Sequence, residues 1–335
     1  MTIPAHFSAF RIHNDASLPD GRGHRSGIEQ ITPDDLAPGE VVIRTAYSSV
    51  NFKDALAGTG EGKILRKFPL VGGIDVAGHV VASTDAKFKE GDAVLVTGSG
   101  LSETRDGGYS EYARLQSQWT VALPNGLGLR ESMIIGTAGF TAALALFRML
   151  DNRQTPELGP LAVTGATGGV GSLAVDIFSR AGFAVHAISG KPEHADYLRE
   201  LGASEVLGRD ALATTRPLDS ARFGGGLDNV GGPMLASLLA QTAPYGNVAS
   251  AGLAASHALD ATVMPFIIRG VSLLGVASAG TARDIREAVW QHLASDWKPA
   301  HLDRICTREV TLDQLPEVFP TMLAGGSFGR TVVRL

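Results

Sequence analysis

The sequence has very little cysteine: Cys306 is the only one among 335 residues. No disulfide can form within the chain, and a zinc site built from several cysteines is excluded. A lone thiol is typical of proteins from reducing compartments, so we expect a cytoplasmic location. The opening residues contain neither a basic nor an apolar segment, and we therefore expect no signal peptide.

Long apolar runs are also scarce. The longest extends from Met133 to Phe147, is interrupted by Gly136 and Gly139, and has Arg130 and Arg148 on either side. It is too short to span a bilayer, so we expect a buried helix there. The net charge of −5 gives no sign of a nucleic acid or an anionic membrane as the partner, and we expect neither.

What the chain does have is glycine, at 41 residues, and enough hydrophobic residues (44%) to fill more than one core. Its length favours two domains. Short runs rich in Val, Ile and Thr at 39–50, 78–83 and 91–98 predict a β-rich barrel or folded sheet in the first part. From Leu161 onward, strand-like runs alternate with helical patterns, which predicts a parallel sheet covered on both faces.

A glycine-rich turn lies between a predicted strand and a predicted helix in the segment LAVTGATGGVGSLAVDIF. In dinucleotide-binding folds such glycines make the tight turn and let the backbone approach the pyrophosphate, which then lies on the helix N-terminus. Ala166 stands where the usual pattern has its first glycine, but the strand before and the helix after supply the required context. We therefore predict a dinucleotide site. The alternative is a glycine-rich turn without a ligand.

The next predicted strand, Ala184 to Ile188, ends in Ser189, Gly190 and Lys191. Folds of this type that select NAD place a carboxylate here to accept from the ribose 2′-OH, whereas a cation favours the 2′-phosphate of NADP. A hydroxyl, an open backbone N–H and an ammonium can all donate to a phosphate. Arg199 on the following helix adds charge. We predict NADP, with a polar turn and a surface lysine as the alternative.

Several motifs together resemble one family. They are NFKDALA, GIDVAG, MIIGTAGFTAALAL, VTGATGGVGSLAV, LDNVGG and TVMPFIIRGVSLLGV. With them the chain resembles the medium-chain dehydrogenase/reductase superfamily, and within it the zinc-independent, quinone-oxidoreductase-like branch of the acryloyl-CoA reductase (YhdH/AcuI) type. The resemblance covers nearly the whole chain.

This resemblance implies an α/β fold in which a Rossmann domain, a doubly wound parallel sheet, is inserted in a GroES-like β-rich catalytic domain. We expect the first part of the catalytic domain at 1–124, the Rossmann domain at 125–257, and a return segment with a dimer-edge strand and the rest of the catalytic domain at 258–335. The resemblance also implies NADPH as hydride donor, an activated alkene as acceptor, and a homodimer.

The chain departs from the usual sequence of the family at Phe52, where a tyrosine is common, and at Lys191, where an arginine is common. Phe52 loses a phenol that could touch the nicotinamide or the substrate, and Lys191 loses the bidentate fork of a guanidinium. Zinc-dependent relatives carry a ligand in a Gly-His-Glu context where this chain reads Gly73-Ile74-Asp75. We expect no metal.

The predicted cofactor contacts come from the glycine turn, the strand tip and the resemblance. They are Phe52, Thr167, Gly168, Gly169, Val170, Ser189, Gly190, Lys191, Arg199, Leu253, Ile267, Ser278 and Arg330. Leu253, Ile267 and Ser278 rest on the resemblance alone. For Arg330 two interpretations stay open: it meets a phosphate, or it pairs with a carboxylate.

Reduction of an unsaturated thioester puts negative charge on the thioester oxygen, which needs a hydrogen-bond donor. Asn51, Lys53 and Asp54 are the predicted catalytic residues: the Asn51 amide as donor, and Asp54 holding Lys53 or a water. In the alternative, Asn51 caps the helix that follows and Asp54 stabilises its first turn; both roles can coexist. Tyr109 is a weaker candidate proton donor, and the favoured alternative is a packed aromatic side chain.

A basic segment, GKILRKFP, contains Lys63, Arg66 and Lys67. It suits the phosphates of a CoA thioester, although a solvated loop is the simpler interpretation. Three functions therefore compete: an acryloyl-CoA reductase, a quinone or alkenal reductase on the same scaffold, and a non-catalytic NADPH-binding protein with a structural or RNA-binding role. The sequence pI of about 6.0 argues against RNA.

Overall fold

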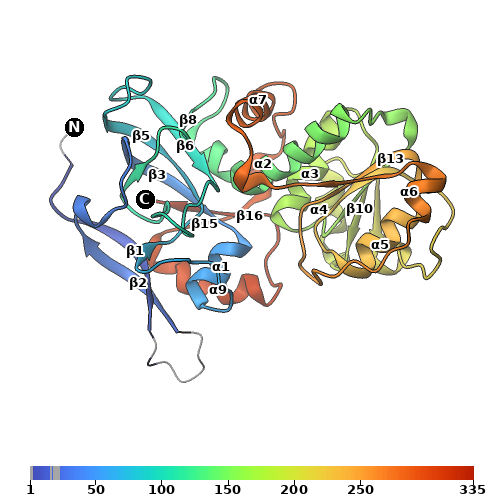
Figure 1. Cartoon of the computed structure of the whole chain (residues 1–335), viewed down its shortest axis with the longest axis horizontal. Helices are drawn as coiled ribbons and strands as arrows, with labels where there is room; N and C mark the ends of the chain where they lie inside the picture. The colour runs from blue at the N-terminus through green and yellow to red at the C-terminus, as the bar shows by residue number, and fades with distance from the viewer. Residues whose placement is uncertain (1–2, 16, 18–22) are drawn as a thin grey trace. The chain divides into compact units, whose positions relative to one another are not determined.

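The computed structural model describes residues 3–15, 17 and 23–335. They form two compact units, each assembled from separate stretches of chain (Figure 1). The first unit comprises 1–137, 279–287 and 306–335, and the second comprises 138–278 and 288–305. The chain passes from the first unit to the second after Thr137 and returns to the first after Ser278. Both boundaries lie later in the chain than those expected at 124 and 257.

The first unit is rich in β-structure, as the Val, Ile and Thr runs predict. A three-stranded sheet has the order β2-β1-β4, and a seven-stranded sheet has the order β15-β16-β3-β5-β6-β8, with β7 also paired to β3. The bounds are β1 (Phe7–Asn14), β2 (His24–Ile31), β3 (Val41–Val50), β4 (Leu70–Val71), β5 (Asp75–Ser83), β6 (Ala93–Thr97), β7 (Tyr112–Leu115), β8 (Val121–Ala122), β15 (Cys306–Val310) and β16 (Arg330–Arg334).

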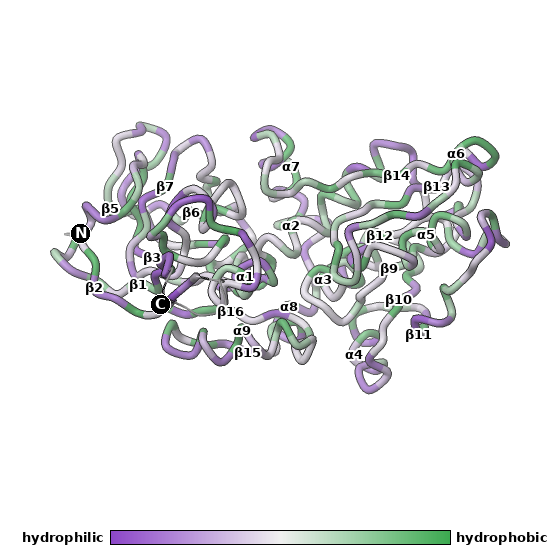
Figure 2. Tube along the Cα trace, turned by 60° about the horizontal axis from the view of Figure 1, so that its bottom comes forward, coloured by the Kyte–Doolittle hydropathy of each residue, from purple (hydrophilic) through white to green (hydrophobic). Residues whose placement is uncertain are grey.

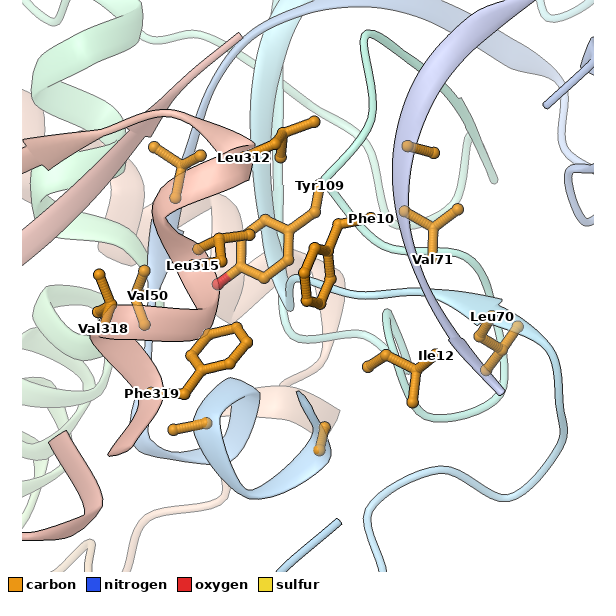
Figure 3. Packing of buried hydrophobic residues seen from close by; sticks show 14 of the residues in the cluster. Phe10, Ile12, Val50, Leu70, Val71, Tyr109, Leu312, Leu315, Val318 and Phe319 are labelled. Atoms are coloured by element: carbon orange, nitrogen blue, oxygen red, sulfur yellow. The ribbon is translucent and has the colours of Figure 1, made fainter. Parts of the chain in front are cut away.

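The end of the chain completes this unit. β16 pairs antiparallel with β3, so that Thr331 lies opposite Val50. Helix α9 (Leu315–Leu323) packs on α1 (Phe52–Thr59), and the contact is so close that a Cβ on Gly58 would collide with the Phe319 ring. The buried cluster in Figure 3 joins Phe319 to Phe10 and Tyr109, which come from the N-terminal third of the sequence.

The second unit is a Rossmann fold. Its six strands are all parallel and lie in the order β11-β10-β9-β12-β13-β14. The bounds are β9 (Leu161–Thr164), α3 (Gly169–Arg180), β10 (Val185–Ser189), α4 (Ala195–Glu200), β11 (Glu205–Gly208), β12 (Phe223–Asp228), α5 (Gly232–Ala240), β13 (Thr242–Ser250), α6 (Met264–Arg269) and β14 (Ser272–Gly275). The strand order reverses between β9 and β12, where such folds bind ligands. The predicted fold class is confirmed.

The longest apolar run forms helix α2 (Leu129–Asp151), as expected. By length and composition alone it is apolar enough to cross a membrane, but 78% of its most apolar window is buried, as in a core helix. Gly136 interrupts the helix with φ 49° and ψ −159°. Two further α-helices are α7 (Arg283–Ala294) and α8 (Leu302–Ile305).

Candidate functional site

Three strand ends meet in the interior of the first unit. β3 ends just before Asn51, β5 begins at Asp75, and β16 begins at Arg330. Both β5 and β16 pair with β3, so residues far apart in the sequence are brought together. Asp54, on the first turn of α1, is 2% exposed, Asp75 0% and Arg330 3%. Two carboxyl groups and one guanidinium are therefore held without access to bulk water.

The Asn51 side chain lies between the charged groups. Its Nδ2 donates to Asp75 Oδ2 at 2.8 Å and to Asp54 Oδ2 at 3.2 Å, and its Oδ1 accepts from Arg330 Nη1 at 3.1 Å. The backbone N–H of Asn51 donates to Asp54 Oδ2 at 2.8 Å, as expected at a helix N-terminus. Both amide hydrogens are thus in use. Asn51 has the position of the cap, and its role as a donor to substrate stays a prediction.

Arg330 directs its hydrogen bonds into the protein. It donates to Ser49 Oγ at 2.7 Å, to Ile134 O at 2.9 Å and to Val50 O at 3.1 Å, and Nη2 lies 3.9 Å from Asp75 Oδ2. Burial lowers its pKa, although Asp75 and Asp54 act in the opposite direction. Of the two interpretations left open, pairing with a carboxylate is the one observed. The placing of Arg330 among the cofactor contacts stays a prediction.

The break in α2 completes this cluster. Thr137 donates to Asp75 through its N–H (2.9 Å, to Oδ2) and its hydroxyl (2.5 Å, to Oδ1). A Cβ on Gly136 would lie 2.7 Å from Asp75 Oδ2 and 2.8 Å from Arg330 Nη2, and φ is positive. Glycine is therefore required both for space and for backbone conformation.

Asp75 has the surroundings of a hydrogen-bonded carboxylate and does not fit a metal ligand. Its Oδ2 accepts from Ser49, Asn51 and Thr137 and lies beside a guanidinium. Among the described residues, no group of three or more His, Cys, Asp or Glu side chains is arranged to hold a metal ion.

The electrostatics of the cluster favour a proton on Asp54. Burial, and next the charge of Asp75, raises the pKa of Asp54 to about 7, against the hydrogen bonds that it accepts from Asn51 and Ile74. A substantial fraction of Asp54 is therefore protonated at neutral pH. Such perturbed carboxyl groups are common at functional sites.

Tyr109 is a packed aromatic residue in this structure. Its ring meets Phe10 edge-on at 6.3 Å and stacks on Phe319 at 6.4 Å, and its hydroxyl donates to Ser49 O at 3.1 Å (Figure 3). Burial, with Asp54 and Asp75 nearby, raises its pKa well above the ordinary value. The alternative favoured from the sequence agrees with this placement.

Lys53 has a different partner from the one expected. Its ammonium forms an ion pair with Glu103, so Asp54 does not hold Lys53 in place. The reason is direction: Asp54 points into the core toward Ile74 N (2.9 Å), whereas the Lys53 side chain is partly exposed. Phe52, between Asn51 and Lys53, is 50% exposed.

In the second unit, the glycine turn has the geometry of a nucleotide site. Gly165 adopts φ +61°, Gly168 N donates to Gly165 O at 2.9 Å, and α3 begins at the next residue. A Cβ on Gly171 would lie 2.6 Å from Ala166 Cα, so the helix packs against the turn more closely than any side chain allows. The first N–H groups of α3, including those of Gly169 and Val170, are thus presented at the carboxyl end of the sheet.

The tip of β10 lies beside this turn. Ser189 Oγ is 3.4 Å from Thr167 Oγ1 and accepts the backbone N–H of Lys191 at 3.0 Å. The predicted contacts Thr167, Gly168, Gly169, Val170, Ser189, Gly190 and Lys191 therefore belong to one small region. These residues fit the pyrophosphate and ribose of a dinucleotide.

A polar network at the point of strand reversal was not predicted. Thr164 Oγ1 donates to Asp228 Oδ1 at 2.7 Å, Asn229 Nδ2 donates to Thr164 O at 2.8 Å, and Gly231 N donates to Asp228 Oδ2 at 2.7 Å. Burial raises the pKa of Asp228. The network joins the ends of β9 and β12 and fixes the turn after β12. These residues belong to the motif LDNVGG, which the sequence analysis used only for the family resemblance.

The other predicted cofactor contacts are more scattered. Arg199 is exposed on α4 and forms an ion pair with Asp196 at 2.7 Å. Leu253 is 67% exposed near the turn that holds Gly231, and Ile267 is 75% exposed on α6. Ser278 begins a short 3-10 helix, Ser278–Gly280.

Comparison with known proteins agrees with this architecture. Two family models match: the alcohol dehydrogenase GroES-like domain over residues 37–125, and the zinc-binding dehydrogenase over residues 169–295. Acrylyl-CoA reductase AcuI of Ruegeria pomeroyi is 43% identical over 92% of this chain and 94% of its own.

Two solved structures are also closely similar. YhdH from Salmonella enterica, in complex with NADP, has a TM-score of 0.93 and 41% identity and covers 98% of this chain and 99% of its own. YhfP of Bacillus subtilis, with NAD bound, has a TM-score of 0.94 and 43% identity and covers 99% and 100%.

A GroES-like unit combined with an inserted Rossmann unit defines the medium-chain dehydrogenases/reductases. Within that class, the chain belongs to the family of AcuI, YhdH and YhfP, with which it shares more than two fifths of its residues over nearly its whole length. The resemblance inferred from the motifs is confirmed.

Proposed function

We propose that the protein is an NADPH-dependent reductase of activated alkenes, which reduces the C=C bond of acryloyl-CoA to give propanoyl-CoA without a metal. The observation that carries the proposal is the pairing of an intact glycine turn with a strand tip, Ser189 to Lys191, that has no carboxylate. Its family includes a protein named acrylyl-CoA reductase, and YhdH binds NADP.

NADPH, when bound, supplies the hydride. The N-terminus of α3, with Gly168, Gly169 and Val170, would hold its pyrophosphate, and Ser189 and Lys191 its ribose phosphate. Phe52, Leu253, Ile267 and Ser278 remain proposed contacts. Arg330, in contrast, holds Asp75 and Asn51 in place from inside the first unit.

The catalytic proposal centres on Asn51 and Asp54. Negative charge develops on the thioester oxygen during reduction, and preorganised donors stabilise it. Asn51 makes its longer amide bond, 3.2 Å, to Asp54. A proton on Asp54 weakens that bond, because a neutral carboxyl group is a poorer acceptor, and this frees one N–H of Asn51. Lys53 is proposed to contribute by fixing the first turn of α1 through Glu103.

A CoA thioester fits the basic loop after α1. Lys63, Arg66 and Lys67 are exposed, while Leu65 between them is 7% exposed and anchors the loop. Arg66 N donates to Glu103 O at 2.8 Å, and Glu103 also pairs with Lys53 on α1. The backbone of the loop is therefore joined through Glu103 to the first turn of α1, and we propose that its cations bind the phosphates of CoA.

The assay is NADPH oxidation with acryloyl-CoA, with a quinone, with a simple alkenal, and with no acceptor. Turnover that is most efficient with acryloyl-CoA supports the proposal. Turnover with the quinone or alkenal alone supports the second candidate, favoured by the name of YhfP, which provisionally assigns that protein to the quinone oxidoreductases. Tight NADPH binding without turnover supports the non-catalytic candidate, structural or RNA-binding. The kcat/KM with NADPH should be at least ten times that with NADH. This ratio corresponds to a difference of about 1.4 kcal/mol in activation free energy.

We further propose a cytoplasmic homodimer that binds neither nucleic acid nor a membrane. β14 is the last strand of the Rossmann sheet, so one edge of it is open to a second β14. Exposed apolar side chains lie close by: Ile267 (75%), Ile268 (58%) and Leu273 (36%). Figure 2 shows α6 as a hydrophobic segment at the surface of this unit. An apolar patch beside an open strand edge is typical of an interface.

A further inference from the structure

One pair of opposing residues on β5 and β6 anchors two places where the chain passes between the units. Asp75 and Thr97 lie directly opposite each other on these antiparallel strands. The chain leaves the first unit after Thr137, whose N–H and hydroxyl both donate to Asp75. It returns at Ala279, which Arg286 of α7 joins to Thr97. The catalytic cluster and the returning segment therefore share one anchor in the first unit.

Arg286 makes the second of these connections. It is 2% exposed; its Nη1 donates to Thr97 O at 3.0 Å and to Thr97 Oγ1 at 3.1 Å, and its Nη2 donates to Ala279 O at 3.2 Å. Burial lowers its pKa to about 10, against the charge of Asp75, so the guanidinium remains charged at neutral pH. Burying a charge is costly unless hydrogen bonds compensate it, and here the bonds join two separate segments.

The end of β6 also contacts the returning segment through its backbone. Ser99 N donates to Ala279 O at 3.2 Å, so this carbonyl accepts both a backbone N–H and a guanidinium. A Cβ on Gly98 would lie 2.9 Å from Ala279 Cα, and Gly98 has φ +63°, which favours glycine. The backbone at Ala279 is therefore closely fixed, and Arg286 bridges it to β6.

The residue fixed in this way is the neighbour of a proposed cofactor contact. Ser278 directly precedes Ala279 and follows shortly after the end of β14. It thus lies beyond the carboxyl end of a parallel strand, the edge at which Rossmann folds bind their ligands. Hydride transfer requires the reacting atoms to be closely aligned, and a displacement of about 1 Å can lower the rate on the order of 10²-fold.

We propose that Arg286 is a positioning residue: by holding Ala279 on Thr97, it fixes Ser278 and orients the nicotinamide end of NADPH for hydride transfer. The proposed sites for the pyrophosphate and the ribose phosphate lie elsewhere, at the N-terminus of α3 and the tip of β10. Arg286 should therefore affect the orientation of the nicotinamide more than the affinity for the cofactor. The inference rests on the proposed function for the use of NADPH and for Ser278 as a contact.

Arg286→Met tests the proposal, because methionine can fill the buried position but donates no hydrogen bond. We expect a dissociation constant for NADPH within threefold of that of the unmodified protein, while the fluorescence emission of bound NADPH changes toward that of the free cofactor. We also expect kcat to fall at least tenfold. The primary isotope effect with NADPH deuterated at the transferred position should increase, since hydride transfer then limits turnover.

Arg286→Lys is the conservative variant. An ammonium keeps the charge but is a single point that cannot reach both segments as the guanidinium does, so emission and kcat should change in the same direction to a smaller extent. If Arg286→Met does not fold, this variant carries the test, and values equal to those of the unmodified protein would overturn the proposal.

Arg283, one turn earlier on α7, supplies the matched control. It also donates to two backbone carbonyl groups of the first unit, Ser117 O and Gln118 O, at 3.0 Å each. Arg283→Met should lower stability and leave the emission of bound NADPH, kcat and the isotope effect unaltered.

The emission measurement needs no acceptor, so it separates this inference from the proposed function. Unchanged emission of NADPH bound to Arg286→Met would overturn the inference even in a protein that reduces no alkene. In a protein that does turn over, an unaltered kcat together with lower stability would leave Arg286 with a structural role only. Absence of turnover in the unmodified protein, with the emission changed in Arg286→Met, would refute the proposed reaction and support the positioning of the nicotinamide.

Discussion

Asp54 and Asp75, two buried carboxyl groups, accept hydrogen bonds from the same side-chain nitrogen, Asn51 Nδ2, at 3.2 Å and 2.8 Å. Asp75 is further supported by Ser49, Thr137 and Arg330. Asp54 has no cation within the distance of an ion pair among the described residues, which is why burial raises its pKa so strongly. The shared amide is therefore the link between a well-compensated carboxylate and a poorly compensated one.

Replacing Asn51 tests whether this link serves catalysis. Asn51→Ser keeps a capping oxygen but loses the amide donor to both carboxyl groups. We expect kcat to fall on the order of 10²-fold with little change in KM, because the lost donor acts mainly in the transition state. Stability should fall by about 1–3 kcal/mol, since a buried acceptor loses its donor. Steady-state kinetics and urea unfolding give both values.

A cap elsewhere supplies the control for that change. Thr32 caps a 3-10 helix in the same unit, and its hydroxyl donates to Asp35 at 2.9 Å. Thr32→Ala should cost stability of roughly 1 kcal/mol with kcat unaltered. Full turnover in a folded Asn51→Ser protein would leave Asn51 with the structural role only.

The proton on Asp54 makes folding stability depend on pH. In the folded protein the pKa of Asp54 is raised to about 7, whereas the ordinary pKa of an aspartate side chain is 3.8. Unfolding therefore releases a proton between these values, and stability falls as pH rises from about 4 to about 7. The loss attributable to Asp54 is on the order of 4 kcal/mol. Urea unfolding at several pH values should show this slope, and Asp54→Asn should flatten it. An equal slope in both proteins would contradict the assignment.

A feature of this protein could be predicted from the sequence when its residues lie close together along the chain. The Rossmann unit could be predicted because its evidence is local: the glycine turn, the strand after it and the helix between lie within one segment, 161–189. The buried cluster could not, because Asn51, Asp75, Gly136 and Arg330 meet only through the pairing of β3 with β5 and β16.

Metal removal tests the expectation that the reaction needs no zinc. Asp75 is surrounded by hydrogen-bond donors and a guanidinium, an environment that repels a cation. Prolonged dialysis against a chelator should leave kcat unchanged, and elemental analysis should find far less than one zinc per chain. A stoichiometric metal whose removal abolishes activity would refute this expectation.

Charge on the apolar patch tests the proposed dimer. Ile267→Asp combined with Ile268→Asp places two carboxylates in the expected interface, where they cannot be solvated. Light scattering should then give the mass of one chain, 35.0 kDa, in place of two. Ile28→Asp changes an isoleucine of comparable exposure (46%) in the first unit and should leave the dimer intact. A monomeric unmodified protein would rule out the dimer.

The basic loop predicts a difference between two substrates that share the same reacting group. Acryloyl-CoA carries the nucleotide phosphates, whereas acryloyl-pantetheine does not. Neutralising the three cations as Lys63→Gln, Arg66→Gln and Lys67→Gln should lower kcat/KM for acryloyl-CoA at least tenfold through KM and change that for acryloyl-pantetheine less than twofold. The unmodified enzyme should also lose affinity for the CoA thioester as salt rises, because exposed charges are screened.

The matched control is Lys87→Gln with Lys89→Gln, since both lysines are exposed on another loop of the same unit. It should leave both substrates unaffected. An equal loss for acryloyl-CoA and acryloyl-pantetheine in the loop variant would indicate damage to the neighbouring turn of α1, to which the loop is joined through Glu103. No loss with either substrate would show that the cations are only solvated. In both cases the loop would not be the binding site for the CoA phosphates, and the proposed reaction itself would still stand.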